Sequence, residues 1–268
     1  MAGTGSLWLI GAGNMGGAML RGWIAAGIAP ARIAVIDPFV ASVPDGVALL
    51  RDVPTGDAQP DILVLAVKPQ QLDAIRTIFA AKSGAARLLV SILAGVETST
   101  LSNSFTPSFT VRAMPNLPVS IGEGVTALYS SDADEQTRAE AAALVAPLGL
   151  VEWIDDEGLF DAVTALSGCG PGFLFRFIDA MAEAGASLGL PRDQALRLAT
   201  ATVKGSGLLA AKSDESPSVL ADRVASPGGS TREGLNVLDA DEALRSLMRK
   251  TLAAAAKRNA ELAAAARA

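Results

Sequence analysis

Two glycine-rich turns are the segments of this 268-residue sequence whose residue types are best suited to hold a ligand. One is Gly11–Gly16, and the other is Ser226–Thr231, which contains two adjacent glycines. Glycine lets a backbone approach a ligand without a Cβ clash. A helix that begins at such a turn directs free N–H groups and the positive end of its dipole toward an anion. The second turn therefore predicts a site for a small carboxylate, with the alternative that Ser230 and Glu233 only form a capping box.

The residue types that are missing restrict the chemistry as strongly as those present. The chain has no histidine, which excludes a histidine base, a histidine-activated nucleophile and histidine metal ligands, and no metal site is expected. The one cysteine, Cys169, is expected to pack as a small hydrophobic residue, and any tyrosine acid would have to be Tyr129. Hydride transfer suits this composition, because the cofactor carries the difficult step.

The first turn has the spacing of a dinucleotide-binding loop. Gly11, Gly13 and Gly16 lie between a strand-like and a helix-like segment, where they permit a tight turn and the close approach of a pyrophosphate. Asp37 ends the second predicted strand, where an acid can bind the ribose; its alternative is a simple turn residue. Lys68 ends the third predicted strand, at the edge where ligands bind in such sheets, and its alternative is a solvated surface lysine.

The N-terminal part of the chain alternates strand-like and helix-like segments. This alternation predicts an α/β fold with a Rossmann-like, doubly wound parallel sheet. The segment 39–60 carries three prolines and is expected to hold little regular helix. The predicted strands are Ser6–Ile10, Arg32–Ile36, Asp61–Val67, Leu88–Ile92, Phe109–Met114, Val125–Tyr129 and Leu150–Trp153, and the predicted helices are Asn14–Ala26, Gln70–Ala80 and Asp134–Val145.

After Trp153 the sequence predicts only helices. We therefore expect a dinucleotide-binding domain over residues 1–154 and an all-α domain over residues 155–268. The predicted helix Pro171–Leu188 is apolar around most of its surface, which is typical of a helix buried on most sides. It favours a subunit interface in addition to an internal core, with a self-contained bundle as the alternative. The other predicted helices are Pro191–Ala211, Ser218–Val224, Thr231–Leu238 and a long one from Asp241 onward.

Composition excludes several classes of partner. The net charge is −6 and no basic block occurs, so nucleic acid is not an expected partner. No uninterrupted apolar run reaches the ~18 residues that span a bilayer, and the start of the chain lacks the pattern of a signal peptide. A single cysteine fits a reducing compartment. We expect a soluble, cytoplasmic protein.

Short motifs along nearly the whole chain resemble the pyrroline-5-carboxylate reductase family. The turn after the third strand, the segment before Leu117 and the start of the helical part all match the family pattern. The most specific match is the second glycine-rich turn. The matching segments are Gly11–Gly16, Ala66–Pro69, Arg112–Asn116, Asp161–Gly168, Gly189–Arg192 and Ser226–Thr231.

The resemblance implies an NAD(P)H-dependent reduction of 1-pyrroline-5-carboxylate to L-proline, the last step of proline biosynthesis. It also implies a helical domain that interlocks in a homodimer, which can assemble further. It places the substrate carboxylate on backbone N–H groups of Gly229, Ser230 and Thr231, with the catalytic Thr231 hydroxyl near the ring nitrogen and Val224 lining the pocket. With Asp37, the implied cofactor contacts are Gly11, Ala12, Gly13, Asn14, Met15, Gly16, Ala66, Val67, Lys68, Ile92 and Ala94.

Three features depart from the family pattern. Leu117 replaces a common threonine, Gly172-Phe173 replaces Ala-Tyr, and the segment after the second strand is shortened, so that this strand ends in Asp37. A carboxylate there can accept hydrogen bonds from both ribose hydroxyls of NADH but faces the 2′-phosphate of NADPH. No arginine follows within the next few residues. The sequence therefore predicts NADH or NADPH as cofactor, with a preference for NADH.

Other functions remain as alternatives on sequence grounds. A β-hydroxyacid dehydrogenase has a catalytic lysine on a helix after a glycine-rich turn, whereas Ser167–Gly172 leads here into Phe173–Phe175 without a lysine. That turn is either a linker or a close backbone contact to a nicotinamide ring. A non-catalytic dinucleotide-binding protein would not need the second glycine-rich turn. A reductase of another cyclic imine would keep the same motifs.

Overall fold

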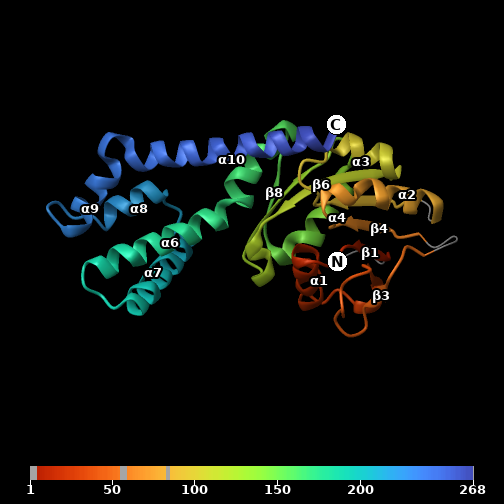
Figure 1. The fold of residues 1–268 in the computed structure, drawn as a ribbon, viewed down its shortest axis with the longest axis horizontal. Helices are drawn as coiled ribbons and strands as arrows, with labels where there is room; N and C mark the ends of the chain where they lie inside the picture. Colours follow the sequence, from red (N-terminus) through yellow and green to blue (C-terminus); the bar gives the residue numbers. More distant parts are fainter. Residues whose placement is uncertain (1–4, 55–58, 83–84, 268) are drawn as a thin grey trace. The chain divides into compact units, whose positions relative to one another are not determined.

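The computed structural model describes residues 5–54, 59–82 and 85–267 (Figure 1). Two compact units form, one from Met1–Cys169 with Ala255–Ala268 and the other from Gly170–Ala254. The last turns of the chain thus pack with the N-terminal unit. This division by packing differs from the boundary at 154/155 that the sequence predicts, because the helical segment 155–169 and the end of the chain pack with the sheet.

The first unit is built on one eight-stranded sheet. Its strand order is β3-β2-β1-β4-β5-β6-β7-β8, and the pairs are parallel except for β6 with β7. All four residues of β1 are buried, as expected for a parallel strand covered on both faces. The strands are β1 Leu7–Ile10, β2 Ile33–Ile36, β3 Ala48–Leu50, β4 Ile62–Leu65, β5 Leu88–Ser91, β6 Phe109–Pro115, β7 Gly124–Tyr129 and β8 Gly149–Trp153.

Helices cover both faces of this sheet, which confirms the doubly wound α/β fold. Alternate residues of β1 point into two separate cores. Leu9 belongs to a core with residues of α1 (Asn14–Ala25) and α4 (Glu135–Val145). Trp8 and Ile10 belong to a core with residues of α2 (Leu72–Lys82) and α3 (Thr98–Phe105).

The predicted strands and helices of the N-terminal part are present, with ends that differ by a few residues, but two elements were missed. The segment 39–60 holds the short strand β3 and no helix among its described residues, while residues 55–58 lie outside the description. Helix α3 carries three serines and two threonines over eight residues, so it lacks a strong helical signal. The antiparallel pairing of β6 with β7 also departs from a wholly parallel sheet.

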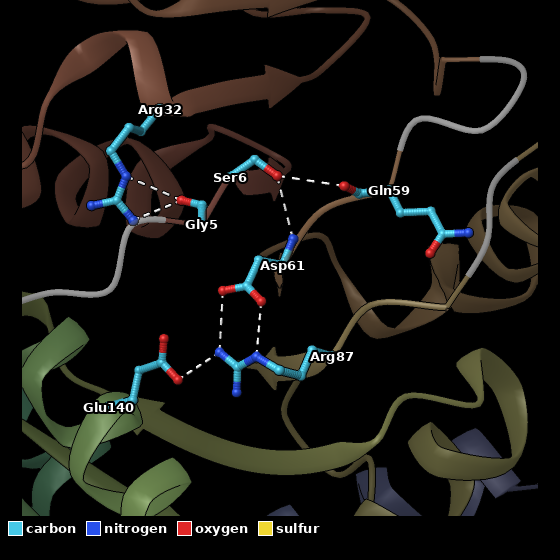
Figure 2. A network of polar contacts seen from close by, with 7 residues as sticks. All are labelled: Gly5, Ser6, Arg32, Gln59, Asp61, Arg87 and Glu140. Atoms are coloured by element: carbon cyan, nitrogen blue, oxygen red, sulfur yellow. Dashed lines mark hydrogen bonds and ion pairs between the residues drawn. The ribbon is translucent and has the colours of Figure 1, made fainter.

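An ion-pair network joins the amino-terminal edge of the sheet to α4 (Figure 2). Arg87, just before β5, donates two hydrogen bonds to Asp61, just before β4, at 2.8 and 3.1 Å, and one to Glu140 at 2.6 Å. Hydrogen bonding to Asp61, with the nearby charge of Glu140, raises the pKa of Arg87 further above its usual range. The network lies at the edge opposite to the strand ends where ligands bind, and it stabilises the fold.

The second unit contains helices only, over residues that the structure describes throughout. Helix α6 (Gly170–Ser187) and helix α7 (Arg192–Lys212) pack side by side (Figure 1). They are followed by α8 (Pro217–Arg223), α9 (Ser230–Asp239) and the first half of α10 (Ala243–Arg267).

The core of this helical unit is very small. Its fully buried cluster consists of Ala182, Ala195 and Ala199. The sequence predicts a mostly buried α6, yet Phe175 and Phe177 of this helix are 56 % and 49 % exposed in the single chain. By length and composition alone, one helical stretch of the described chain, Glu157–Ser187, is apolar enough to cross a membrane, although polar residues interrupt it. A large apolar surface is therefore uncovered in this chain.

Candidate functional sites

The first glycine-rich turn joins β1 to α1 in a conformation that requires glycine at two of its three glycine positions. Gly11 has φ +90°, and its N–H donates to the carbonyl of Ile36 at 3.1 Å. A Cβ atom on Gly16 would collide with the carbonyl oxygen of Gly11. A Cβ on Gly13 would meet no described protein atom within 4 Å, so this position faces open space. Gly13 is also the N-cap residue of α1, and no side chain of the described residues caps that helix.

A cavity of about 270 Å³ opens beside this turn. It brings Gly11 and Gly13 of this turn together with Asp37 and Lys68, which are far from the turn in the sequence. The predicted cofactor residues Ala66 and Val67 also line it. Open space at Gly13 and free N–H groups at the start of α1 fit a pyrophosphate, and the cavity fits the adenosine half of a dinucleotide.

Backbone hydrogen bonds between neighbouring strands align the turns that follow those strands. The N–H of Ala66 donates to Ile10 at 2.8 Å, and the N–H of Ile92 donates to Leu65 at 3.0 Å. The turns after β1, β4 and β5 therefore leave the sheet at one edge. After β4, the N–H of Lys68 donates to the side chain of Gln71 at 3.1 Å, which fixes this turn while the lysine lines the cavity.

Asp37 is almost fully buried, with an exposed fraction of 9 %. Its carboxylate accepts hydrogen bonds from the N–H groups of Ala12 at 2.8 Å, Phe39 at 2.8 Å and Val40 at 3.1 Å. Burial alone would raise its pKa, but these three bonds, with the charge of Arg51, hold the pKa below its usual range. Asp37 is therefore a carboxylate at neutral pH.

These bonds bear on how Asp37 can hold a ribose. A carboxylate has about four acceptor positions, and three are used by backbone N–H groups. Binding both ribose hydroxyls at once, as the sequence predicts, would require Asp37 to share these bonds. The remaining acceptor position of Asp37 can take a hydrogen bond from one ribose hydroxyl without disturbing the three backbone bonds.

Arg51 is a residue of this site that sequence reasoning missed. Ile36 of β2 pairs with Leu50 of β3, so the residues that follow them, Asp37 and Arg51, lie side by side. The Arg51 guanidinium donates to the carbonyls of Val40 at 2.6 Å and Asp37 at 3.2 Å, and it lines the cavity. Arg51 lies 14 residues beyond Asp37, too far along the chain to be linked to it by spacing. The apolar run before Arg51 was the signal for β3.

The second glycine-rich turn lies between α8 and α9 in the helical unit. Gly228 has φ +71°, and Gly229 is the N-cap residue of α9. A Cβ on Gly229 would lie 2.6 Å from the hydroxyl of Ser226, which can rotate away, so it is the positive φ of Gly228 that requires glycine in this turn. Val224 is the C-cap residue that follows α8 and is 66 % exposed, and Thr231 lies in the first turn of α9.

The capping box that was the alternative for this turn does not form. Ser230 is the first helical residue rather than the cap, and the N–H of Glu233 donates to the carbonyl of Gly229 at 3.2 Å. Among the described residues no side chain caps α9, so its first-turn N–H groups are open to a ligand. Arg232 donates to Asp222 at 2.8 Å and thereby joins α9 to α8.

Comparison with known proteins decides the family. Residues 157–262 match the family model described as pyrroline-5-carboxylate reductase dimerisation. Residues 6–95 match one described as NADP oxidoreductase, coenzyme F420-dependent. The pyrroline-5-carboxylate reductase of Pseudomonas aeruginosa is 36 % identical over 97 % of this chain and 97 % of its own. The chain belongs to the pyrroline-5-carboxylate reductase family.

Solved structures of the family have the same fold. The pyrroline-5-carboxylate reductase of Coxiella burnetii is 33 % identical, with a TM-score of 0.87 over 97 % of this chain and 99 % of its own. The Plasmodium falciparum enzyme, solved with NADP bound, is 27 % identical with a TM-score of 0.79 over 97 % and 98 % of the two chains. Like other pyrroline-5-carboxylate reductases, this chain is an oxidoreductase that uses NAD(P)H and acts on a CH–NH group.

Family membership also accounts for the uncovered apolar surface. The helices α6 to α9 all lie inside the region that matches the dimerisation model. The stretch Glu157–Ser187 lies within it too, and an apolar surface there fits a dimerisation region.

The family motif before Leu117 has a visible role. Asn116 donates from its side chain to the carbonyl of Ser167 at 3.0 Å and accepts from the N–H of Val125 at 2.8 Å. It thereby ties β7 to the π-helical turn Thr164–Gly168, which leads into α6 after a bend at Cys169, so the stretch Ser167–Gly172 is mostly helical and not the turn that the sequence predicts. Leu117, which departs from the family pattern, is 54 % exposed, and neither of these two bonds involves it.

Proposed function

We propose that this chain reduces 1-pyrroline-5-carboxylate to L-proline as a homodimer, the last step of proline biosynthesis. The observation that carries the proposal concerns the first turn of α9, which follows Gly229. No described side chain caps this turn. A helix start without a capping side chain, on a turn where glycine is required, is suited to a carboxylate ligand. The chain has no histidine, and the reaction we propose needs none.

The substrate is held by backbone groups of this turn. The N–H groups of Ser230 and Thr231 bind the carboxylate, and Val224 lines the pocket. The N–H of Gly229, which the sequence adds to this set, donates to the carbonyl of Ser226 at 2.9 Å, so it can bind the carboxylate only by sharing that bond. Thr231 places its hydroxyl beside the ring nitrogen, where it can hydrogen-bond this atom and orient the ring. The exposed position of Val224 and the place of Thr231 in the first turn of α9 support this role, because a ligand at the turn can reach both.

The dinucleotide is held by the first unit. The pyrophosphate lies on the Gly11–Gly16 turn, including Ala12, Asn14 and Met15. The ribose lies near Asp37, and further contacts come from Ala66, Val67, Lys68, Ile92 and Ala94. When bound, NAD(P)H supplies the hydride that reduces the imine carbon of the pyrroline ring. The protein holds this carbon in position for transfer, and the ring nitrogen takes its proton from solution before the C=N bond is reduced.

We further propose that NADH is preferred over NADPH. Asp37 is ionised and lines the cavity, so a 2′-phosphate would meet a negative charge at close range. Arg51 carries the opposite charge, but its guanidinium already donates to two backbone carbonyls. The other N–H groups of Arg51 are the feature that would weaken the preference for NADH, if they bind the 2′-phosphate of NADPH.

The proposed assembly is a homodimer through the helical part of the chain, which can assemble further. We treat residues 155–268 as one functional domain for substrate binding and dimerisation, and residues 1–154 as the dinucleotide-binding domain. The small core of the helical unit and its exposed phenylalanines support this, because such a surface needs a partner of similar apolar character. The location we propose is the cytoplasm.

Incubation with NADH and 1-pyrroline-5-carboxylate tests the function. We expect oxidation of NADH coupled to formation of proline, and none with a 2-hydroxy acid and NAD⁺. Efficient turnover of another cyclic imine, without turnover of pyrroline-5-carboxylate, would assign the chain to that imine instead. Dinucleotide binding without any turnover would indicate a binding protein.

A further inference from the structure

We propose that Asn259, near the end of α10, binds the carboxamide of the nicotinamide ring, so that the C-terminal turns of the chain complete the cofactor site. In sequence, this alanine-rich end shows only weak amphipathicity and no motif. The inference rests on the proposed use of NAD(P)H. It adds a residue, and a wall of the site, that none of the cofactor contacts above includes.

The observation behind it is a second cavity in the first unit, of about 230 Å³. One side is formed by Pro69 and Gln70, which follow β4, and by Ala94 and Gly95, which follow β5. Ligands of doubly wound sheets bind at these carboxyl ends of the strands. The turn after β4 lies between the two cavities, because Lys68 lines the first and Pro69 lines the second.

The other side of the cavity comes from segments much later in the chain. Asp161 and Thr164 line it, together with Asn259 and Leu262 of α10. All these residues belong to the first compact unit, so the cavity is a property of that unit alone. The C-terminal turns of α10 therefore face the strand ends where a nicotinamide half is expected.

Two contacts hold the end of α10 in this place. Gly95 has φ +73°, and a Cβ on it would lie 3.0 Å from the Cα of Ala263, which is buried. The helix thus approaches the turn after β5 as closely as two small residues allow. The side chain of Asn259 donates to the carbonyl of Asp161 at 3.4 Å. Asn259 is therefore oriented by its own unit before a ligand arrives.

The lining has the chemistry of a carboxamide site. Asn259 has two N–H donors and one acceptor oxygen, and the bond to Asp161 uses a single donor. A nicotinamide carboxamide also carries a donor and an acceptor, so the two groups can pair. Among the described residues, the lining contains Asp161 and no cationic side chain, which disfavours a phosphate or a substrate carboxylate as the occupant. Thr164 donates to Phe160 at 2.7 Å and keeps its acceptor positions for a ribose hydroxyl.

The test compares two ligands on two variants of the full-length protein. ADP-ribose shares every part of NADH except the nicotinamide, so a nicotinamide contact affects only NADH. For Asn259→Ala we expect the Kd of NADH to rise about tenfold, because one hydrogen bond and its orientation are lost, with the Kd of ADP-ribose unchanged. The matched control is Glu261→Ala on the same helix, where Glu261 is exposed and paired with Arg258. This control should leave both values unchanged.

A second variant addresses the cavity rather than the hydrogen bond. Leu262→Trp adds bulk at a half-exposed position of the lining, and we expect it to weaken NADH binding and spare ADP-ribose. Unchanged NADH binding in both variants, or equal losses for NADH and ADP-ribose, would overturn the assignment. If the wild type binds NADH with the expected variant pattern but does not reduce pyrroline-5-carboxylate, the proposed reaction fails while this inference stands.

Discussion

The two glycine-rich turns look alike in sequence but are stabilised by different surroundings. In the first, glycine is required at Gly11 and Gly16 because a Cβ at either position would collide with backbone atoms, those of the turn after β4 or of the glycine-rich turn itself. This turn lies beside a large core. In the second, a Cβ on Gly228 would meet no described atom within 4 Å, and Gly229 is limited only by Ser226 of its own turn. The helical unit around the second turn has a buried cluster of three alanines.

The difference shows which site a single chain can form by itself. The first turn takes its shape from long-range packing within its own unit, so we expect a single chain to be able to hold the dinucleotide. The second turn is local structure on a surface that stays apolar and uncovered. Its positioning, and therefore the substrate site, should depend on assembly, whereas the cofactor site should not.

The strongest test of this contrast is to place a charge on the uncovered surface. We expect Phe177→Glu to prevent dimer formation and abolish turnover, because the charge would have to be buried unpaired in the interface. Sedimentation at micromolar concentration should show dimers, and no folded monomer, for the wild type. Leu150→Glu is the control, since Leu150 is 60 % exposed on β8 of the other unit. A stable, monodisperse wild-type monomer would contradict the dimer.

A second test separates packing from ligand binding within the first turn. Gly16→Ala should lower the free energy of unfolding by about 1–3 kcal/mol, because its Cβ would overlap the carbonyl of Gly11. Gly13→Ala should leave the thermal midpoint unchanged and weaken NADH binding, since only a ligand approaches that position. Thermal unfolding and NADH titration measure the two effects. Equal stability losses in the two variants would show that Gly13 is not kept open for a ligand.

The corresponding test of the second turn is Thr231→Ala. It removes the hydroxyl but keeps the backbone N–H groups, so kcat/KM for pyrroline-5-carboxylate should fall about 10- to 100-fold, the effect of one hydrogen bond to a polar or charged partner. NADH affinity should change little. Ser230→Ala is the control, because Ser230 does not cap α9 and its removal should not lower stability. Wild-type kcat/KM in Thr231→Ala would place the substrate elsewhere.

The cofactor preference gives a smaller effect. We expect kcat/KM to be higher with NADH than with NADPH, and Asp37→Ser to reduce this preference by removing the charge that faces the 2′-phosphate. In the Asp37→Ser background, Arg51→Ala should raise the KM for NADPH if the guanidinium then reaches the phosphate. A roughly tenfold preference of the wild type for NADPH, an energy of about 1.4 kcal/mol, would reverse the role assigned to Asp37.

The smallest effect expected is on the pH dependence of stability. The pKa of Asp37 is lower in the folded than in the unfolded chain, so its contribution to stability is fully present above the unfolded value and is lost as the pH falls through the folded value. Urea unfolding of the wild type and of Asp37→Asn at neutral and at acidic pH measures this. The difference between the two proteins should shrink on acidification. A constant difference would mean that the charge of Asp37 does not stabilise the fold.

The sequence by itself determined the elements whose signal is local. The buried run of β1, the glycine spacing before α1 and the long amphipathic helices follow from neighbours a few residues apart, and they were predicted nearly at their observed ends. The paired glycines also predicted the second turn as a carboxylate site, and the family resemblance named its ligand, which stays a prediction. The uncovered apolar surface of α6 follows from its composition, because this helix carries too few polar residues to face water on most sides.

Only the tertiary structure decided which distant residues share a site. Arg51 reaches Asp37 because β3 pairs with β2, and Asn259 reaches the turn after β5 because the end of α10 packs in the first unit. The extended dihedral angles of Gly229 make this residue, and not Ser230, the N-cap residue of α9. The shared sites rest on contacts between segments that are well separated in sequence, for which neither periodicity nor spacing along the chain carries a signal.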